Sequence, residues 1–183
     1  MQHPAATAVI DRRYRESFAA TVRPSFRDYV GCSRTSGSIA ALGFRRASGG
    51  ALFLESYLDQ PVEALVVQAL ARPCDRSAIV EIGNFAADNA VVMLDLWGKV
   101  ANDLGGACEI AVATLTAPLR RMFQRIGIPI QIIAPARPER LGADGASWGS
   151  YFAQDPQVCV GVIADGQQAL ATWLQRRRTG NAA

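Results

Sequence analysis

Histidine is almost absent from this sequence, because His3 is the only one and it lies at the N-terminus. A Ser-His-Asp or Cys-His catalytic system needs a histidine base inside the fold, so the sequence argues against both. A zinc site built on histidines is disfavoured on the same ground, and we expect no metal. Any general base must therefore be a carboxylate, a tyrosine, a terminal group or water.

Long apolar runs and paired cysteines are also missing. No run of about 18 apolar residues, a length that could span a membrane, occurs in the chain. The N-terminus lacks the basic region and apolar stretch of a signal peptide, and the four cysteines form no CxxC pair. We therefore expect a cytoplasmic protein with no stable membrane insertion and no disulfide framework.

Lysine is nearly absent as well, since Lys99 is the only one and arginine supplies the rest of the positive charge behind a net charge of +3. The arginines are scattered along the chain, with three pairs and one run at 176–178. Nucleic-acid proteins instead concentrate them on one stripe with interleaved aromatics. We therefore expect no nucleic-acid partner. Guanidinium pairs suit anionic small molecules or an acidic protein surface.

The sequence contains enough apolar residues for one folded domain. With 183 residues, half of them hydrophobic, the chain can bury a core without disulfides or metals. We expect flexible tails at 1–9 and 179–183 and a single domain over 10–178. The sequence does not define the oligomeric state, and a homodimer is one arrangement open to it.

Turn and periodicity signals divide this domain into strands followed by alternating strands and helices. Ser48, Gly49 and Gly50 predict a turn, which would close a hairpin between the second and third strands. This order predicts an α/β (α+β) fold, with a mixed central sheet and helices on both faces. Strands are predicted over residues 25–33, 38–47, 51–58, 77–87, 108–115, 128–135 and 158–164, and helices over residues 11–23, 61–72, 90–104, 117–126 and 165–178.

Glu81 lies within an apolar strand pattern, directly between Val80 and Ile82. A carboxylate that faces a cleft from such a strand has a raised pKa and can act as a general base. The alternative is a structural carboxylate that pairs with a nearby arginine or points to solvent at a sheet edge. The sequence leaves both interpretations open.

Gly83 and Asn84 interrupt the apolar pattern of the same strand. Glycine inside a strand marks either a bulge, which frees backbone groups to bond a ligand, or a simple bend of a twisted sheet. Beyond the strand, Asp88 or Asn89 is a suitable N-cap for the next helix. Amides at a helix start can receive a phosphate, although the charge of Asp88 opposes this.

The polar, glycine-rich segment 136–157 carries a cluster of aromatic residues. These side chains either wall an apolar pocket for an acyl chain or pack the segment onto the core. The phenol of Tyr151 could serve as a proton donor. Arg137 and Arg140 in the same segment are suited to bind a carboxylate or a phosphate. The clustered aromatics are Trp148, Tyr151 and Phe152.

Four stretches carry a family resemblance: EIGNFAA (81–87), TLTAPLRRMFQRIGIPI (114–130), ARPERL (136–141) and WGSYFAQDPQVCVG (148–161). In this order they resemble the thermostable hemolysin family, and more distantly the GNAT acyltransferase superfamily that includes acyl-homoserine lactone synthases. The last stretch is the most specific, and the first third of the chain matches in pattern only. The family name implies a lytic activity, for which the sequence offers no secretion signal and no membrane span.

The GNAT resemblance also implies where a donor binds. An acyl thioester would lie along the interrupted strand, its pyrophosphate would meet the start of the next helix, and a later helix would shape its exit. The EIGNFAA string is also similar to a glutamate-plus-phenylalanine strand motif of the lactone synthases. The donor-binding residues implied in this way are Asn84, Phe85, Ala86, Ala87, Asp88, Asn89, Thr116 and Phe123.

The sequence departs from the GNAT pattern in three places. The usual arginine- and glycine-rich pyrophosphate loop is absent at 87–91, Thr116 replaces an asparagine, and Phe123 stands where a tyrosine often protonates the departing thiolate. These departures make an acyl carrier protein an alternative donor to acyl-CoA. Surface arginines would suit the acidic face of such a carrier.

These observations favour an acyltransferase that moves a fatty acyl group from acyl-CoA or acyl carrier protein to a small amine or hydroxyl acceptor. Glu81 would take the acceptor's proton, and backbone amides near Asn84–Ala86 would hold the thioester oxygen. Tyr151 would supply the proton that Phe123 cannot. The substrate pocket is expected to include Trp148, Phe152, Arg137 and Arg140.

Two other functions remain as alternatives. The chain could be a non-enzymatic membrane-active protein, for which the apolar face of the helix at 61–72 is the best candidate. It could also be a binding module that kept the fold and lost the chemistry, as the missing phosphate loop suggests.

Overall fold

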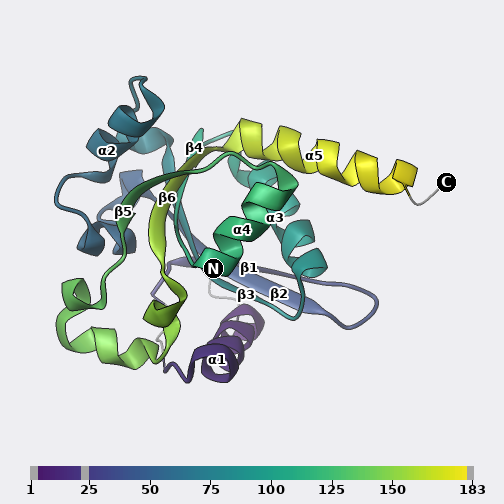
Figure 1. Ribbon diagram of the computed structural model, residues 1–183, viewed down its shortest axis with the longest axis horizontal. Coiled ribbons are helices and arrows are strands. Elements are labelled where there is room, and N and C mark those ends of the chain that lie inside the picture. Colours follow the sequence, from purple (N-terminus) through teal and green to yellow (C-terminus); the bar gives the residue numbers. More distant parts are fainter. Residues whose placement is uncertain (1–3, 22–24, 181–183) are drawn as a thin grey trace.

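Figure 1 shows the computed structural model, which describes residues 4–21 and 25–180. The helices are α1 (Pro4–Phe18), α2 (Val62–Leu70), α3 (Ala90–Leu104), α4 (Ala117–Ile126) and α5 (Ile163–Gly180). The strands are β1 (Asp28–Ser33), β2 (Ile39–Arg46), β3 (Ile79–Ala87), β4 (Ile110–Leu115), β5 (Gln131–Pro135) and β6 (Gln157–Val162). Short 3-10 helices lie between them: η1 (Ala47–Gly49), η2 (Phe53–Tyr57), η3 (Arg76–Ala78), η4 (Pro138–Trp148) and η5 (Tyr151–Gln154).

The strands form one mixed sheet in the order β1-β2-β3-β4-β6-β5. Neighbouring strands pair antiparallel, except that β3 and β4 run parallel. A parallel pair requires a crossover connection, and α3 lies in the connection between these two strands. The predicted α/β fold with a mixed central sheet is thus confirmed.

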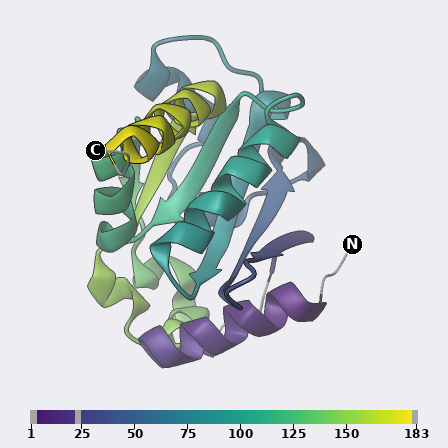
Figure 2. The same ribbon diagram turned by 90° about the vertical axis from the view of Figure 1, so that its right-hand side faces the viewer.

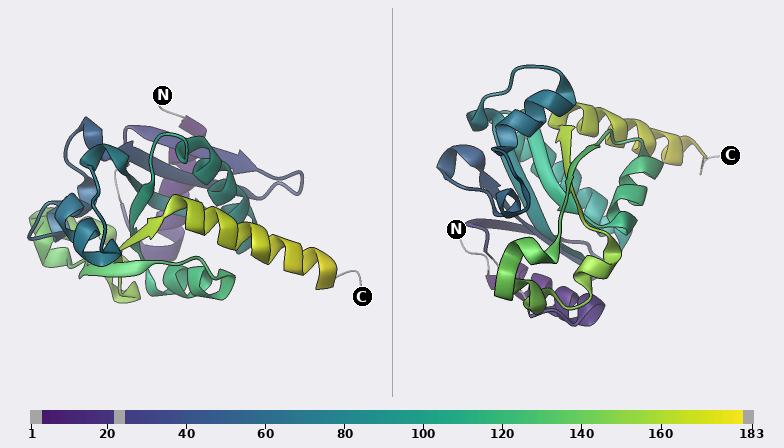
Figure 3. Two further views of the ribbon diagram at one scale, coloured as in Figure 1. Left: turned by 90° about the horizontal axis from the view of Figure 1, so that it is seen from above. Right: turned by 60° about the vertical axis from the view of Figure 1, so that its left-hand side comes forward.

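Helices cover both faces of this sheet, as the turned views in Figure 2 and Figure 3 show. On one side, which we call the helix face, α3, α4 and α5 pack against the strands around Val80, Leu96 and Leu115. On the other side, which we call the opposite face, α1, η2 and α2 pack around Ile10 and Leu54. Because successive strand residues point to opposite sides, β3 contributes side chains to both layers.

The two ends of the chain are more ordered than the predicted tails. α1 begins at Pro4, because Ala6 and Ile10 are buried against β1 and β2, so residues 4–9 belong to the fold. At the other end α5 continues to Gly180. The outermost parts of the predicted tails, 1–3 and 181–183, lie outside the described residues.

The hairpin predicted around Ser48, Gly49 and Gly50 does not form. Residues 53–57 of the predicted third strand form η2 instead, because Glu55 and Glu81 accept hydrogen bonds from backbone amides of this segment. The strand before it pairs with β1 on one side and β3 on the other. The observed hairpin therefore joins β1 to β2.

An ion-pair cluster fixes the connection from η2 to α2 and η3. Arg76 donates to both carboxylate oxygens of Glu55 at 2.7 Å and to Glu63 at 2.7 Å. These hydrogen bonds from Arg76 lower the pKa of Glu55 to about 2. The cluster is only partly exposed, so solvent screens it less than a surface pair.

Replacing Glu55 by glutamine should lower the free energy of unfolding by about 2 kcal/mol at pH 7, since hydrogen bonds to charged groups contribute about 1.5–3 kcal/mol. The pKa of Glu55 lies below its ordinary value of 4.5 in the folded state. Its contribution is therefore present above that value and is lost as the pH falls toward about 2. Urea unfolding of both proteins between pH 7 and pH 3 should show the difference shrinking. Glu16→Gln, in an exposed pair with Arg13, is the control, and a pH-independent difference contradicts the assignment.

Candidate functional site

β3 and β4 separate toward one end of the sheet. Their parallel pairing runs from Ile79 opposite Ile110 to Ile82 opposite Ala113. Within these two described strands pairing stops there, although both continue for further residues. Backbone groups on the diverging edges are therefore released from the β3–β4 ladder.

A bulge in β3 lies beside this separation. The register against β2 shifts here, and β3 has one more residue than β2 between the pairs on either side. Asn84 adopts φ 51°, in the left-handed region, and is buried. After the extra residue, Phe85 packs with the helix-face cluster and Ala86 with the α1 cluster. Of the two alternatives that the sequence left open at Gly83 and Asn84, the structure therefore has the bulge.

An apolar cavity borders the separated strands on the helix face. Ile82, Phe85 and Ala113 from the strands meet Trp97 of α3 and Phe123 of α4 around about 110 Å³. We call this space the helix-side cavity. An apolar cavity of about 150 Å³ takes up benzene, so the space suits part of an acyl chain.

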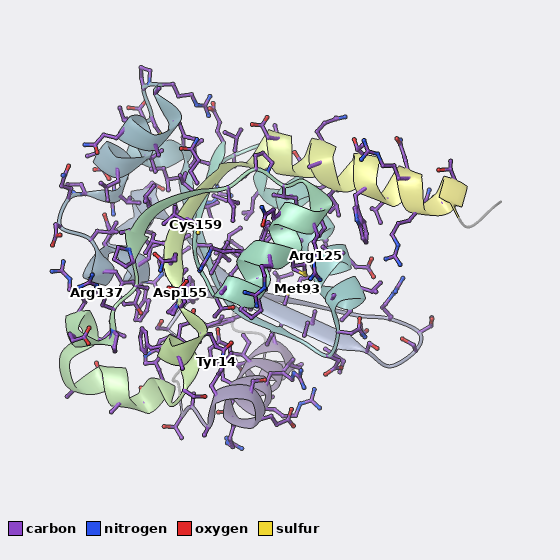
Figure 4. The ribbon with its side chains drawn as sticks, viewed as in Figure 1. Tyr14, Met93, Arg125, Arg137, Asp155 and Cys159 are labelled. Atoms are coloured by element: carbon purple, nitrogen blue, oxygen red, sulfur yellow. The ribbon has the colours of Figure 1, made fainter. Side chains whose placement is uncertain are left out.

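Trp97 brings a buried N–H group to the wall of the helix-side cavity. This group, the indole Nε1, has no hydrogen-bond partner among the described residues. The ring packs against Phe85, at 5.6 Å between centroids, and against Phe123. Cys159 of β6, labelled in Figure 4, also lines this space.

A smaller pocket of about 30 Å³ borders the separation on the opposite face. Glu81 and Asn84 of β3 and Thr114 of β4 are among its polar residues. Ile82 lines both this pocket and the helix-side cavity. The two spaces therefore lie on either side of the strand separation and share Ile82 as a wall residue. We call the smaller one the aromatic pocket, because its walls include Tyr14, Phe53, Tyr57, Trp148 and Tyr151.

Glu81 is 2% exposed and lines the aromatic pocket. Its Oε2 accepts a hydrogen bond from Phe53 N at 2.8 Å, and its Oε1 accepts one from Leu54 N at 2.9 Å. Arg45 Nε lies 3.5 Å from Oε2. Burial raises the pKa of Glu81, although the two amides and Arg45 act against that rise. Glu81 therefore has the arginine partner expected of a structural carboxylate. It also lines a pocket, as a general base must.

Three tyrosines surround the aromatic pocket. Burial raises the pKa of Tyr14, Tyr57 and Tyr151, so their phenols stay protonated at neutral pH. The rings of Tyr14 and Tyr151 stack at 6.1 Å between centroids, and Trp148 lies 5.1 Å from Tyr151. Phe152 packs against Tyr57 and Trp148. The aromatic segment therefore lines the pocket and also packs its own loop onto the core.

The start of α3 has its own side-chain cap. Asn89 Oδ1 accepts hydrogen bonds from Val91 N at 3.0 Å and Val92 N at 3.1 Å. Asp88 accepts one from the β2 backbone at 2.8 Å and pairs with Arg12 at 3.0 Å. Amides that a pyrophosphate would need are thus occupied, and a carboxylate stands beside them.

The remaining predicted site residues lie apart from both spaces. Arg140 donates to the backbone of Leu58 at 2.7 Å and pairs with Asp59 at 2.8 Å, so it ties η4 to the end of η2. Arg137 precedes η4 on the exposed side of the segment, as Figure 4 shows. Thr116 is buried before α4 and forms no side-chain cap. Ala87 ends β3 among the helix-face cluster.

Sequence reasoning missed residues that complete the site. Tyr14 on α1, Phe53 and Tyr57 on η2, and Arg45 on β2 all contact the pocket or Glu81. The contact of Arg45 with Glu81 could be predicted only from the register of β2 against β3, in which the two residues are directly opposite each other. The three aromatics carried no signal, since one was assigned to a surface helix and two to a strand.

Comparison with known families identifies the chain. The family model described as thermostable hemolysin matches residues 1–167. The chain belongs to this family. The comparison with curated proteins gives no match for this thermostable hemolysin family member.

Several solved structures have a similar fold with TM-scores above 0.5, among them TofI, FeeM and BjaI. TofI, solved in a ternary complex with an inhibitor and MTA, is 20% identical with TM-score 0.56, covering 93% of this chain and 92% of that chain. FeeM, an N-acyl amino acid synthase from uncultured soil microbes, is 13% identical with TM-score 0.53, covering 90% and 92%. BjaI, a CoA-dependent acyl-homoserine lactone synthase solved with SAM and isopentyl-CoA, is 15% identical with TM-score 0.54, covering 94% and 79%. At these identities the likeness establishes the fold alone, a mixed sheet with helices on both faces.

Neither a membrane-spanning helix nor a metal-holding cluster of side chains occurs in the part of the chain that the structure describes. Across 4–21 and 25–180, no helix is long and apolar enough to cross a membrane. The same part of the chain has no group of three or more His, Cys, Asp or Glu side chains arranged to hold a metal ion.

Proposed function

We propose that this thermostable hemolysin family member is an acyltransferase that moves an acyl group from a thioester donor to a small amine. The observation that carries the proposal is the separation of β3 and β4 after Ile82, which the helix-side cavity borders on one face of the sheet and the aromatic pocket on the other. An acyl chain in the apolar cavity would present its thioester carbonyl at this junction. An acceptor in the aromatic pocket would reach the same carbon from the other face.

Glu81 is the proposed general base. The amine nitrogen attacks the thioester carbon, the nitrogen–carbon bond forms, and the carbon–sulfur bond breaks. Glu81 takes the proton released from the amine, and its raised pKa makes it a stronger base than an ordinary carboxylate. The same proton then passes to the departing thiolate, which leaves as a thiol. Both oxygens of Glu81 stay oriented by amides of η2.

The bulge supplies the proposed hydrogen-bond donors for the thioester oxygen. Backbone amides near Asn84, Phe85 and Ala86 lie where β3 has left the β4 ladder. Fixed amides aimed at a developing oxyanion stabilise the transition state. Asn84 holds the left-handed backbone conformation that redirects these amides.

Tyr151 is better suited to hydrogen bonding than to proton transfer. Burial raises its pKa well above the ordinary tyrosine value, whereas a free thiol has a pKa near 8.5. A thiolate is therefore too weak a base to remove the phenol proton. We assign Tyr151 the role of a donor to the acceptor or to the tetrahedral intermediate.

The capped start of α3 favours acyl carrier protein over acyl-CoA as the donor. A carrier presents its phosphopantetheine from its own surface, so the enzyme needs no pyrophosphate site at Asn89. Arg121 and Arg125 are exposed on α4, and Figure 4 labels Arg125 on this helix. Phe123 of the same helix lines the helix-side cavity. These guanidinium groups would complement an acidic carrier surface.

The membrane-active alternative loses its main support. Val62 and Val66 of α2 are fully buried, and Leu65, Ala69 and Leu70 pack against the same core cluster. The apolar face of this helix therefore serves the fold and is not available to a bilayer.

Native mass spectrometry of the purified protein with acyl carrier protein and acyl-CoA donors tests the proposal. We expect retention of acyl carrier protein loaded with a medium or long chain, and at least tenfold weaker retention of the same chain on CoA, about 1.4 kcal/mol. Addition of an amine panel should then release a product heavier by the acyl group. Unloaded carrier protein is the control for retention through the protein surface alone. If neither donor is retained and no acylated amine forms, the acyltransferase proposal fails.

A further inference from the structure

A cleft rich in arginine adjoins the aromatic pocket on the opposite side of Phe26. β1 begins at Asp28 opposite Phe44, so the last two residues of β2 extend beyond it. The space beyond the start of β1 is lined by Arg27, Arg45 and Arg46, with Asp28 as an acidic neighbour. We call this space the arginine cleft.

The arginine cleft and the aromatic pocket adjoin each other. Ser25 and Phe26 line both of them. Arg45 lines the cleft while its Nε stands 3.5 Å from Glu81, which lines the pocket. An acceptor with its amine beside Glu81 would extend past Phe26 into this region of positive charge.

Arg45 is held rigidly between the two spaces. Its Nη2 donates to Ser25 O at 2.5 Å, and its guanidinium lies 4.8 Å from the centre of the Phe26 ring. Its Nε is buried and lacks a hydrogen-bond partner among the described residues. Arg45 thus provides a fixed charge, oriented by Phe26 and Glu81, that lies close to the reacting end of an acceptor.

Arg27 and Arg46 are exposed and available for a ligand. Within the described part of the chain neither forms an ion pair, whereas Arg12, Arg34, Arg72 and Arg76 each have a carboxylate partner. Both residues line the arginine cleft, and a guanidinium group can offer two parallel N–H groups to a carboxylate or a phosphate.

The geometry points to an acceptor that carries an anionic group, a carboxylate or a phosphate, bound in the arginine cleft by Arg27 and Arg46. This inference rests on the proposed acyl transfer and specifies its acceptor. The aromatic pocket measures about 30 Å³, room for little more than an amine head, since one water needs about 10–15 Å³ by the same measure. The rest of the acceptor must lie beyond Phe26, where the charge of the cleft selects an anion.

Acceptor pairs that differ only in the anion test the inference. Alanine would be compared with ethylamine, which lacks only the carboxylate, and with 2-aminoethyl phosphate. Each would be assayed with the wild type, Arg27→Gln, Arg46→Gln, the double variant, and Arg72→Gln as a surface-arginine control. We expect the double variant to raise KM for the anionic acceptors about tenfold or more, because two charge-assisted contacts are lost, with kcat nearly unchanged.

The outcomes separate the possible sources of the anion. A lower KM for alanine assigns a carboxylate, and a lower KM for 2-aminoethyl phosphate assigns a phosphate; both support an anionic acceptor. An equal KM for ethylamine and alanine in the wild type overturns the inference. An unchanged KM in a folded double variant overturns the assignment of Arg27 and Arg46.

A binding measurement distinguishes this inference from the proposed function. Ligand-observed NMR with alanine, ethylamine and 2-aminoethyl phosphate needs no turnover and no donor. If no acyl transfer occurs but the anionic ligands bind to the wild type and not to the double variant, the cleft is established and the acyltransferase proposal fails. If acyl transfer occurs and none of the anionic ligands binds better than ethylamine, the cleft inference fails and the proposed function stands.

Discussion

Replacing Glu81 by glutamine should lower kcat about 100-fold or more, the range expected when a general base is removed. Retention of the acyl donor should be unchanged, because Glu81 faces the aromatic pocket and is absent from the lining of the helix-side cavity. Kinetic assays of acyl transfer to an amine measure the loss of turnover. Native mass spectra of the donor complex measure donor retention.

The pH profile separates a base from a purely structural carboxylate. A base must be ionised, and burial raises the pKa of Glu81, so kcat/KM of the wild type should fall with decreasing pH already above the ordinary carboxylate range. The glutamine variant should lack this limb. Glu81 also holds the amides of Phe53 and Leu54, so Glu81→Asp serves as a second variant that retains the ionisable group. Wild-type turnover in a folded glutamine variant removes Glu81 from the mechanism.

Replacing Ala113 by phenylalanine should weaken the retention of long-chain donors about 50-fold or more. Ala113 lines the helix-side cavity at the last paired position of β4 against β3, and an added phenyl ring would occupy much of its volume of about 110 Å³. Exclusion of even three methylene groups costs about 2.4 kcal/mol, roughly 50-fold in affinity. Titration of the protein with donors of increasing chain length measures the effect.

Short donors provide the internal control for this variant. An acetyl donor has almost no chain to exclude, so its retention should change much less than that of a long-chain donor. Val67→Phe, on the exposed surface of α2, controls for an added aromatic ring elsewhere. Melting temperatures should be compared as well, because overpacking a core costs about 1–3 kcal/mol. Equal weakening of all donors contradicts the placement of the acyl chain.

The predictable parts of the fold came from local signals. Strand and helix periodicity located all six observed strands. It also predicted a strand at 51–58 that does not form, because backbone amides of this segment donate to Glu55 and Glu81 and residues 53–57 form η2. The glycine beside Asn84 marked the position of the irregularity in β3, but it did not distinguish the observed bulge from a simple bend. These signals depend on residues that are close in the sequence, so they can be recognised without knowledge of the tertiary contacts.

The candidate site was only partly accessible from the sequence, because most of its contacts join distant segments. Glu81 and Tyr151 line one pocket, yet Arg45 and Tyr14 entered the site through sheet register and helix docking that no local pattern encodes. Arg140 shows the reverse case. Its charge suggested a ligand, but the backbone of Leu58 and the carboxylate of Asp59 occupy it.

The positions of the three tryptophans give this protein a built-in optical readout. Trp97 lines the helix-side cavity, Trp148 lines the aromatic pocket, and Trp173 lies on α5 with Arg177 4.8 Å from its ring. Indole emission responds to its surroundings, so donor and acceptor occupancy should each perturb a different fluorophore. Phenylalanine substitutions that leave a single indole would let binding at each space be followed in unlabelled protein, with Trp173 as the reference that neither ligand reaches.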